Sequence, residues 1–422
     1  MSRVRKEQQN NKKRGLGLSL YSLSTLQRVF LLMMAVVAMA FMVMVIFINA
    51  LPFGMAITFI LLMFVSIALV WWLFERKNKS WRIVAIILAV LYIVIYGLGI
   101  YYLSSTYAAF SKISAKETSG TVAAKPVDVT QDAFNIYITG IDQWNKEKGM
   151  DLERSDVNMI VTVSPQSRTI LLTSIPRDSY VKLHTAQQMD KLTHTGVYGV
   201  DETLNTVEDW LDIDINYYCK VNFTAVVKII NAMEGVRVNS PKAFKSSISK
   251  YYYEKGENLL SGREALYFAR ERKAFDGEDS QRVSNQQIVV KAMLDKLFSS
   301  TTLLFKYGKL LDVAADDFET NMSVDEMSSL VKMQLADLGA WNIKTQKIEG
   351  KYEMDYVASL TQEEKFQVYK TFPTSVEKAI KKINKTKKPS AAEIAKATAA
   401  RQTASAIGFI RNIFSNERKE IN

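Results

Sequence analysis

Five arginines and two aspartates in this chain combine side-chain types that suit a diphosphate ligand. They are Arg154, Arg177, Arg270, Arg272, Arg282, Asp142 and Asp156. The arginine guanidinium is a planar fork of N–H donors that matches phosphate oxygens, so several arginines in one cleft favour a pyrophosphate group. Two carboxylates beside them suit Mg²⁺, which typically binds through one or two carboxylates and substrate phosphates.

Residue spacing indicates which of these side chains can point together. In an extended segment, residues two apart share a face. Arg270 is therefore expected beside Arg272, and Arg154 beside Asp156. The alternative for any single Arg–Asp pair is a surface ion pair that adds little stability.

Helical spacing and strand ends add the remaining candidates. Arg282 and Gln286 are four residues apart, so they are expected to stack on one side of a helix. Asp142 and Arg177 each follow a predicted strand, and the ends of strands are where α/β folds place ligands. Spacing thus nominates one cleft and leaves open whether these side chains meet in it.

The elements that must position these residues alternate between strand and helix patterns. Strand patterns cover 134–140, 158–163, 169–175 and 236–238, and helix patterns cover 200–211, 223–233 and 280–298. A polar turn at 164–168 joins the second and third strands into a predicted hairpin. Asp201 and Thr224 are the expected helix caps, and Gly235 is the expected stop. The alternation predicts an α/β domain.

Three apolar segments precede this domain, namely Val29 to Ile48, Leu51 to Phe74 and Ile83 to Leu103. Each is long enough to cross a bilayer, which takes roughly 20 residues. Buried core helices are the alternative, but three successive runs without an ionisable residue disfavour it. A cleavable signal peptide fits less well, because the first run is too long and two more follow. The sequence predicts three N-terminal transmembrane helices.

The net charge of +11 is unevenly distributed. Residues 1–82 hold eleven Lys and Arg against two Glu, and residues 381–422 hold ten against three, which leaves residues 83–380 mildly acidic. A basic DNA-binding domain is therefore disfavoured. Because Lys and Arg crowd before the first span and again at 75–82, the positive-inside rule places the N-terminus in the cytoplasm and everything after about residue 104 outside.

These patterns divide the chain into five parts. They are a cytoplasmic basic tail at 1–28, three spans within 29–103, a stalk at 104–131, a globular α/β domain at 132–380 and a basic tail at 381–422. The last part could form a basic amphipathic helix on lipid or wall polymer, or a solvated tail. A single cysteine, Cys219, and two histidines exclude an intrachain disulfide and a zinc cluster. Cys219 lies in an apolar strand pattern and is expected in the core.

Eight runs of residues, in their order and at their spacings, resemble the LytR-CpsA-Psr family. They are Asn135 to Asp142, Arg154 to Asp156, Leu172 to Val181, Lys191 to His194, Tyr217 to Phe223, Gly235 to Val238, Ala269 to Arg272 and Arg282 to Gln287. The resemblance is strong over 134–300 and weaker to about 380. It implies an extracytoplasmic α/β domain with a central mixed β-sheet flanked by helices.

The resemblance also implies an enzyme of the cell envelope in mainly Gram-positive bacteria. Such a Mg²⁺-dependent phosphotransferase moves a glycopolymer, such as wall teichoic acid or capsular polysaccharide, from a polyprenyl-pyrophosphate carrier to the muramic acid 6-hydroxyl of peptidoglycan. A phosphodiester bond results. The apolar runs 223–233 and 283–297 could then line a groove for the polyprenyl chain, with ordinary core packing as the alternative.

Site roles follow from the same resemblance, position by position. The implied catalytic residues are Asp142, Arg154, Asp156 and Arg177; the implied pyrophosphate-binding residues are Arg154, Arg177, Arg270, Arg272, Arg282 and Gln286; the implied Mg²⁺ ligands are Asp142 and Asp156. Three positions depart from the family pattern, because Gln281 stands for Gly, Asn285 for Arg and Thr193 for Asn. The role of position 285 therefore stays open, and His194 is expected to tie down a loop.

Two other functions remain open from the sequence. A membrane-anchored regulator of cell-envelope genes would need a cytoplasmic DNA-binding domain. The predicted cytoplasmic segments are too short for a helix-turn-helix domain. A non-catalytic wall-polymer binding protein would need basic and aromatic residues but would not need the paired acids. Loss of Asp142 or Asp156 should separate that function from catalysis.

Overall fold

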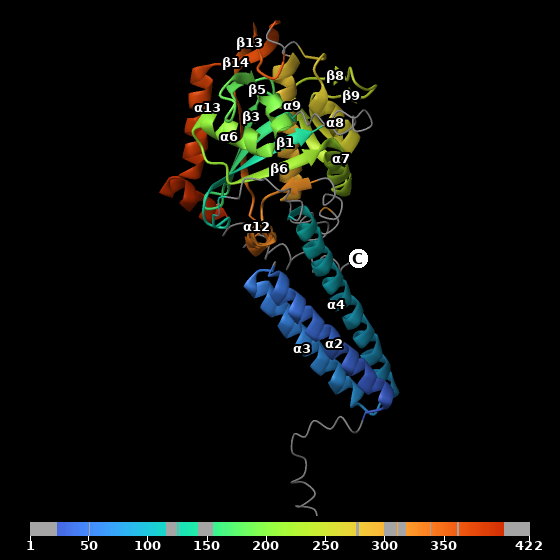
Figure 1. The fold of residues 1–422 in the computed structure, drawn as a ribbon. Coiled ribbons are helices and arrows are strands. Elements are labelled where there is room, and N and C mark those ends of the chain that lie inside the picture. The colour runs from blue at the N-terminus through green and yellow to red at the C-terminus, as the bar shows by residue number, and fades with distance from the viewer. Residues whose placement is uncertain are drawn as a thin grey trace, which may run out of the picture. The chain divides into compact units, whose positions relative to one another are not determined.

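The computed structural model describes most of the chain in two compact units. The described residues are 23–49, 51–114, 125, 127–141, 155–275, 278–298, 310, 318–337, 339–360 and 363–400. One unit contains residues 1–47 and 53–104, and the other contains residues 48–52 and 105–422. Figure 1 shows the elements of both units.

The first unit consists of long apolar helices. They are α2 (Thr25–Ile48), α3 (Phe53–Phe74) and α4 (Lys79–Ser114), and all three are long and apolar enough to cross a membrane. The hydroxyls of Thr58 and Ser66 donate to carbonyls four residues earlier, so both are satisfied within their own helix as a bilayer requires. The three predicted spans are confirmed as helices. Helix α4 continues past Leu103 into the predicted stalk, because residues 104–114 contain no Gly or Pro.

The second unit is built on a mixed six-stranded sheet in the order β11-β6-β1-β2-β3-β12. The strands are β1 (Phe134–Ile141), β2 (Ser155–Ser164), β3 (Thr169–Ile175), β6 (Tyr217–Asn222), β11 (Phe318–Thr320) and β12 (Asn342–Lys347). Strand β2 is antiparallel to both β1 and β3, β6 is parallel to β1, and β12 is parallel to β3. The predicted hairpin and the mixed sheet are confirmed.

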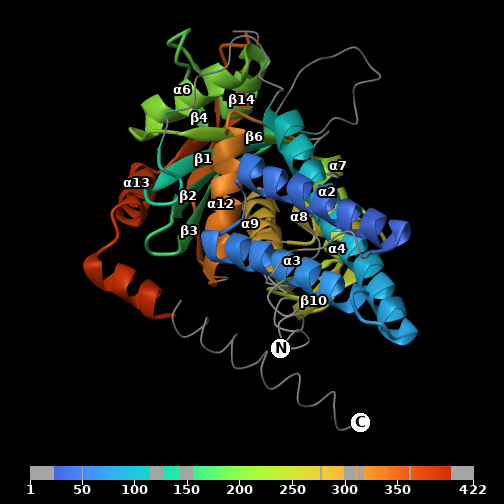
Figure 2. The same cartoon turned by 90° about the horizontal axis from the view of Figure 1, so that it is seen from below.

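Alternating side chains give the sheet two apolar faces, and helices cover both. On β1 and β3, Tyr137 and Leu171 face α6 (Val200–Leu211) and α13 (Pro373–Lys387). Their neighbours Ile138 and Leu172 face α9 (Glu278–Leu297) and α12 (Val324–Asp337) on the other side. Figure 2 shows the sheet between α13 and α9. The α/β layering follows from the two-residue period of the strands.

Smaller elements surround this core. They are β4 (Tyr180–Lys182), β5 (Met189–Lys191), α5 (Leu192–Thr195), η3 (Gly196–Tyr198), α7 (Phe223–Ala232), β7 (Val236–Ser240), β8 (Phe244–Lys245), β9 (Tyr252–Tyr253), β10 (Gly256–Leu260), α8 (Gly262–Arg270), β13 (Gly350–Asp355) and β14 (Phe366–Thr371). Helix α8 approaches α7 so closely that a Cβ on Gly262 would lie 2.2 Å from the Val227 carbonyl oxygen. Only glycine allows this contact.

Both expected helix caps are replaced by neighbouring residues. Gly199, rather than Asp201, is the N-cap of α6, and Asp201 lies in its first turn. Asn222, rather than Thr224, caps α7, because its side chain accepts a hydrogen bond from the Ala225 N–H at 2.7 Å. Asparagine is the stronger cap of the two types.

The C-terminal limit of the domain also differs from the boundary expected at residue 380. Helix α13 runs through Lys387, and Ile383 is fully buried in the core against the sheet. The expected boundary therefore falls inside a packed helix. Residues 391–400 are also helical, and the apolar stretch proposed as an amphipathic helix lies outside the described residues.

Candidate active site

Strands β1, β3 and β6 end, and strand β2 begins, at the same edge of the sheet. Strand β1 ends where β2 begins, with Ile141 paired to Ser155, and β3 ends beside Asn158 of β2. Strand β6 ends at the same edge, because Asn222 pairs with Ile141. Side chains that follow β1, β3 and β6, or that start β2, are therefore brought together by strand pairing alone.

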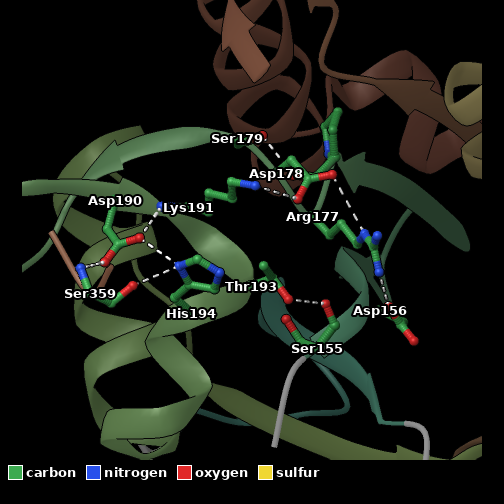
Figure 3. Close-up of polar contacts among 11 residues, drawn as sticks. Ser155, Asp156, Arg177, Asp178, Ser179, Asp190, Lys191, Thr193, His194 and Ser359 are labelled. Atoms are coloured by element: carbon green, nitrogen blue, oxygen red, sulfur yellow. Dashed lines mark hydrogen bonds and ion pairs between the residues drawn. The ribbon is translucent and has the colours of Figure 1, made fainter. Parts of the chain in front are cut away.

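An ion pair between Asp156 and Arg177 occupies this edge, as Figure 3 shows. Arg177 Nε also lies 3.5 Å from Oδ2 of Asp178, and Lys191 Nζ lies 3.8 Å from Oδ1 of the same carboxylate. The side chains of Asp156 and Arg177 are 25% and 29% exposed. This partial exposure leaves both groups accessible to a ligand, and it distinguishes them from a buried structural pair.

Thr193 joins the two backbone segments that carry this ion pair. Its backbone N–H donates to the Arg177 carbonyl at 2.8 Å, and its hydroxyl donates to the Ser155 carbonyl at 3.0 Å. Both acceptors lie at or beside a residue of the pair (Figure 3). Thr193 therefore fixes the spacing of Asp156 and Arg177 through the backbone.

A buried hydrogen-bond network holds the helical turn that contains Thr193. His194 Nδ1 lies 2.7 Å from Oδ1 of Asp190 and 2.8 Å from the hydroxyl oxygen of Ser359. The Ser359 N–H donates to the other Asp190 oxygen at 2.9 Å. Burial opposes ionisation of Asp190, but the hydrogen bonds from His194, Ser359 and the Lys191 N–H outweigh it and lower the pKa of this carboxyl. His194 thus ties down a loop, as expected.

The two arginines at 270 and 272 are not positioned by an extended segment, contrary to the prediction. Arg270 is the last residue of α8, and its Cζ lies 5.4 Å from the ring centroid of Phe223, the residue that follows β6. The buried carboxylate of Glu271 between them accepts hydrogen bonds from Ser246, Ser247 and the backbone N–H of Arg272. Glu271 therefore anchors the segment that carries both arginines.

Arg282 and Gln286 lie one turn apart near the start of α9, and both are buried. This start lies at the same sheet edge, because Lys347 Nζ at the end of β12 donates to the Ser280 hydroxyl at 2.7 Å. Asn285 is fully buried and donates to the Phe268 carbonyl at 3.2 Å. The role of Asn285, which the sequence left open, is therefore structural: its side chain links α9 to α8.

The structure thus brings Asp156, Arg177 and Arg270 to one edge and puts the start of α9 there. Asp142 and Arg154 lie outside the described residues. They directly continue the paired ends of β1 and β2, which are described as far as Ile141 and from Ser155.

An apolar cavity of about 300 Å³ opens between the sheet and the helices α7, α8 and α9. Its floor is the face of β1, β2 and β6 that carries Ile138, and its walls include Val226, Ala269 and Val290. Gln286 is its polar residue beside the arginines, and Phe223, under Arg270, is another wall residue. Some residues of the runs 223–233 and 283–297 therefore line this cavity, and others, such as Ile230 and Ala292, pack in the core.

Cys219 lies on the wall of this cavity, and burial raises the pKa of its thiol to about 12. The thiol is therefore protonated at neutral pH and is part of the apolar lining. Cys219 is of intermediate exposure, so it lines the cavity instead of lying in the core as expected.

A metal at this edge would have to share the phosphates of a substrate. Across the described ranges, no group of three or more His, Cys, Asp or Glu side chains could hold a metal ion. Asp156 contributes one oxygen to Arg177, and a carboxylate has a second oxygen. A single carboxylate fits the mode in which Mg²⁺ is held mainly by substrate phosphates and water.

Comparison with known proteins decides the family. The sequence profile of the LytR_cpsA_psr family matches residues 100–384. The chain belongs to this family. The match ends inside α13, in agreement with the packed position of that helix.

Curated relatives and solved structures agree with this assignment. Over 258 residues the chain is 31% identical to the polyisoprenyl-teichoic acid–peptidoglycan teichoic acid transferase TagU of Bacillus subtilis, which covers 60% of this chain and 82% of TagU. It is 33% identical over 268 residues to TagT of the same organism, covering 61% and 82%. The structure of TagT bound to LI-WTA has a TM-score of 0.50 at 27% identity, covering 62% of this chain and 93% of that one.

Sequence reasoning missed several residues that build the site. In the sequence, Thr193 differs from the family pattern but shows no sign of its positioning role. Glu271 is recognisable only as the residue between two candidate arginines. Ser359 carried no signal, because it lies in the chain more than 160 residues from its partners. Hydrogen bonds of this range leave no periodic pattern in a sequence.

Proposed function

We propose that this protein transfers a polyisoprenyl-linked teichoic acid or related glycopolymer to peptidoglycan. The observation that carries the proposal is the apolar cavity whose wall residue Phe223 lies under Arg270, at the sheet edge that holds the Asp156–Arg177 pair. An amphiphilic substrate with a long hydrocarbon chain and a diphosphate matches this succession of apolar and cationic surfaces. The transferases TagU and TagT support the same activity by sequence similarity.

The cavity supplies the binding energy for the lipid chain. Its lining is apolar, and burial of hydrocarbon gives about 25 cal/mol per Å². The diphosphate would then lie against Arg177, Arg270, Arg272 and Arg282, with Gln286 at the junction. Arginine guanidinium groups neutralise the phosphate charge and orient it by paired hydrogen bonds.

The reaction is a phosphoryl transfer that forms a phosphodiester. The acceptor hydroxyl oxygen of peptidoglycan bonds to the phosphorus that carries the glycopolymer, and the bond from this phosphorus to the bridging oxygen breaks. Polyprenyl phosphate leaves with the electron pair, and the hydroxyl proton passes to a base. Such a transition state needs mainly positioning and charge neutralisation. The arginine cluster would supply both, and this would be the protein's main contribution to catalysis.

We further propose that Mg²⁺ accompanies the diphosphate, held by Asp156 and, from its position after β1, Asp142. The ion would supply additional charge neutralisation on the phosphate oxygens. Asp156 also keeps Arg177 oriented through the ion pair. Lys and Arg are concentrated before the first span and in the loop between the second and third spans. The positive-inside rule puts both segments in the cytoplasm, so we place the domain after the third span outside the cell.

The test is release of polyprenyl phosphate by the purified full chain in detergent. The substrates are a synthetic polyprenyl-pyrophosphate glycan and a peptidoglycan oligosaccharide, with and without Mg²⁺. Arg177→Ala and Asp156→Ala should each lower transfer at least ~100-fold. The matched controls are Arg237→Ala and Glu257→Ala, because these residues form an exposed ion pair in the same unit. Full activity in Arg177→Ala would contradict the proposal.

The same assay separates the two other candidate functions. Tight lipid binding without turnover would favour a binding protein, and binding would then survive Asp156→Ala. A regulator would bind neither substrate and would act through the cytoplasmic segments.

A further inference from the structure

A row of exposed apolar side chains lies on β13 (Gly350–Asp355) and on the residue directly after it, outside the site described above. Tyr352, Met354 and Tyr356 occupy alternate positions and are 37%, 58% and 43% exposed. Alternate residues of a strand share one face. We call these three residues the β13 face. Adjacent large apolar side chains on a surface mark an interaction site more often than scattered ones do.

The charged residues of the same hairpin are already paired with one another. Lys370 Nζ lies 3.1 Å from Glu353 and 2.8 Å from Asp355, and Lys351 Nζ lies 2.6 Å from Glu353. Lys351, Glu353 and Asp355 alternate with the β13 face along the strand, and Lys370 lies across the hairpin from Lys351. These ion pairs neutralise one another, and Lys365 Nζ lies 5.2 Å from the ring centroid of Tyr356, so the β13 face combines aromatic and thioether surface with one ammonium group.

Contacts behind the β13 face hold it in place. The Tyr352 ring meets Tyr369 edge to face at 5.0 Å, and the Tyr369 hydroxyl oxygen accepts the Gly350 N–H at 2.7 Å. The Tyr180 hydroxyl donates to the Tyr356 carbonyl at 2.8 Å. A surface held in this way loses little conformational entropy when a ligand binds.

The hairpin is bonded directly to the loop that carries Arg177. The Tyr369 N–H of β14 donates to the Asp178 carbonyl at 2.8 Å, and Ser179 and Tyr369 form a parallel bridge. Ser359, three residues beyond Tyr356, bonds Asp190 and His194. The β13 face therefore belongs to the same rigid framework as the Asp156–Arg177 pair.

The hairpin and the lipid cavity are attached to different strands of the sheet. The cavity is floored by β6, β1 and β2, Arg177 follows β3, and Ser179 leads on to β14. In phosphoryl transfer the attacking and leaving oxygens lie roughly in line. The acceptor hydroxyl therefore attacks the phosphorus opposite the leaving lipid phosphate, and the hairpin is a neighbouring surface that is not part of the cavity.

We propose that the β13 face binds the glycan strand of the acceptor peptidoglycan. A pyranose ring has an apolar face of C–H groups and a rim of hydroxyls. Tyrosine rings pack against the first and offer a hydroxyl to the second, and methionine adapts to the gaps. This inference rests on the proposed function, since it identifies the subsite for the second substrate of that reaction.

The test is direct binding of a peptidoglycan oligosaccharide to the full chain in detergent, measured by titration calorimetry. The double variant Met354→Ser/Tyr356→Ser should raise the Kd for the oligosaccharide at least tenfold and leave the Kd for the lipid donor unchanged. The matched control is Tyr252→Ser/Leu259→Ser, because both residues are exposed and apolar in the same unit. Tyr356→Phe keeps the ring and loses only the hydroxyl, so it should weaken oligosaccharide binding less than the double variant does.

Several outcomes would overturn the inference. They are an unchanged oligosaccharide Kd in the double variant, no oligosaccharide binding by the unchanged protein, an equal loss of donor affinity, or loss of self-association instead of glycan binding. Failure of the proposed function has a different signature. If glycan binding depends on the β13 face but no polyprenyl phosphate is released, the subsite stands and the transfer reaction does not.

Discussion

The Thr193 backbone N–H donates to the Arg177 carbonyl at 2.8 Å, while its hydroxyl donates to the carbonyl of Ser155, the residue before Asp156. One residue therefore sets the spacing between the segments that carry an arginine and an aspartate of the candidate site. Because Thr193 contacts only their backbone, it acts as a positioning residue.

Thr193→Val removes the hydroxyl and keeps the shape of the side chain. We expect transfer to fall roughly 10- to 100-fold, because small misplacements of catalytic groups are costly. The free energy of unfolding should fall by only about 1 kcal/mol, the usual worth of one hydrogen bond. Thr193→Ser keeps the donor and should restore most activity, measured as polyprenyl phosphate release.

A matched control for this variant is Thr206→Val. Thr206 is also buried, and its hydroxyl oxygen accepts the His184 N–H at 3.1 Å, away from the candidate site. It should show a similar loss of stability without the loss of transfer. Equal transfer activity in Thr193→Val and Thr206→Val would contradict the positioning role of Thr193.

Glu271→Gln should disorganise the segment that carries Arg270 and Arg272. Burial opposes ionisation of Glu271, but hydrogen bonds from Ser247, Ala274 and Ser246 outweigh it and lower the pKa of this carboxyl. The glutamine amide has one oxygen and would place N–H donors against existing donors. We expect a loss of about 2–3 kcal/mol in stability and at least ~tenfold weaker binding of a polyprenyl pyrophosphate.

The exposed Glu257→Gln is the control for this substitution, because Glu257 pairs with Arg237 at the surface. Thermal unfolding followed by circular dichroism gives the stability, and fluorescence titration gives the lipid affinity. Unchanged lipid affinity in Glu271→Gln would show that the two arginines do not hold the diphosphate.

Val290→Phe should fill part of the apolar cavity. Val290 lies on its wall and is only partly buried by protein, so the larger ring extends into open space rather than into a packed core. We expect at least ~tenfold weaker binding of a long polyprenyl pyrophosphate, because several buried CH₂ groups are each worth about 0.8 kcal/mol. A donor with a short chain should bind as before. Equal weakening for both chain lengths would contradict the assignment of the cavity to the lipid chain.

Asp190 should make the stability of the domain depend on pH in the acid range. Its pKa in the folded protein lies below the unfolded value of roughly 3.9. The unfolded state therefore takes up a proton first, and the contribution of Asp190 is fully present above this value and is lost as the pH falls through the folded pKa. Asp190→Asn should lower Tm at pH 7, and the difference from the unchanged protein should shrink below about pH 4. A difference that stays constant down to pH 3 would mean that the charge of Asp190 does not stabilise the fold.

Local pattern alone determined much of the architecture. The run Thr169–Ile175 forms a strand and Val200–Leu211 forms a helix at the predicted bounds, because the first is a short β-favouring run and the second carries a 3.6-residue period. The three apolar helices follow from composition, since few other structures bury such runs. The sequence nominated Asp156 and Arg177 for one cleft, and the antiparallel pairing of β2 with β3 is what brings the two residues together.

The tertiary structure decided what no local pattern contains. Apolar residues of α7 and α9 have the same period whether they pack tightly or line a cavity, so only the spacing between the helices and the sheet shows the cavity. Arg270 ends helix α8 instead of lying in the extended segment expected from its spacing to Arg272. Ser359 and Tyr369 reach the candidate site through contacts between residues far apart in the chain. Such contacts depend on how whole elements pack, and the sequence records them only as isolated polar or aromatic residues.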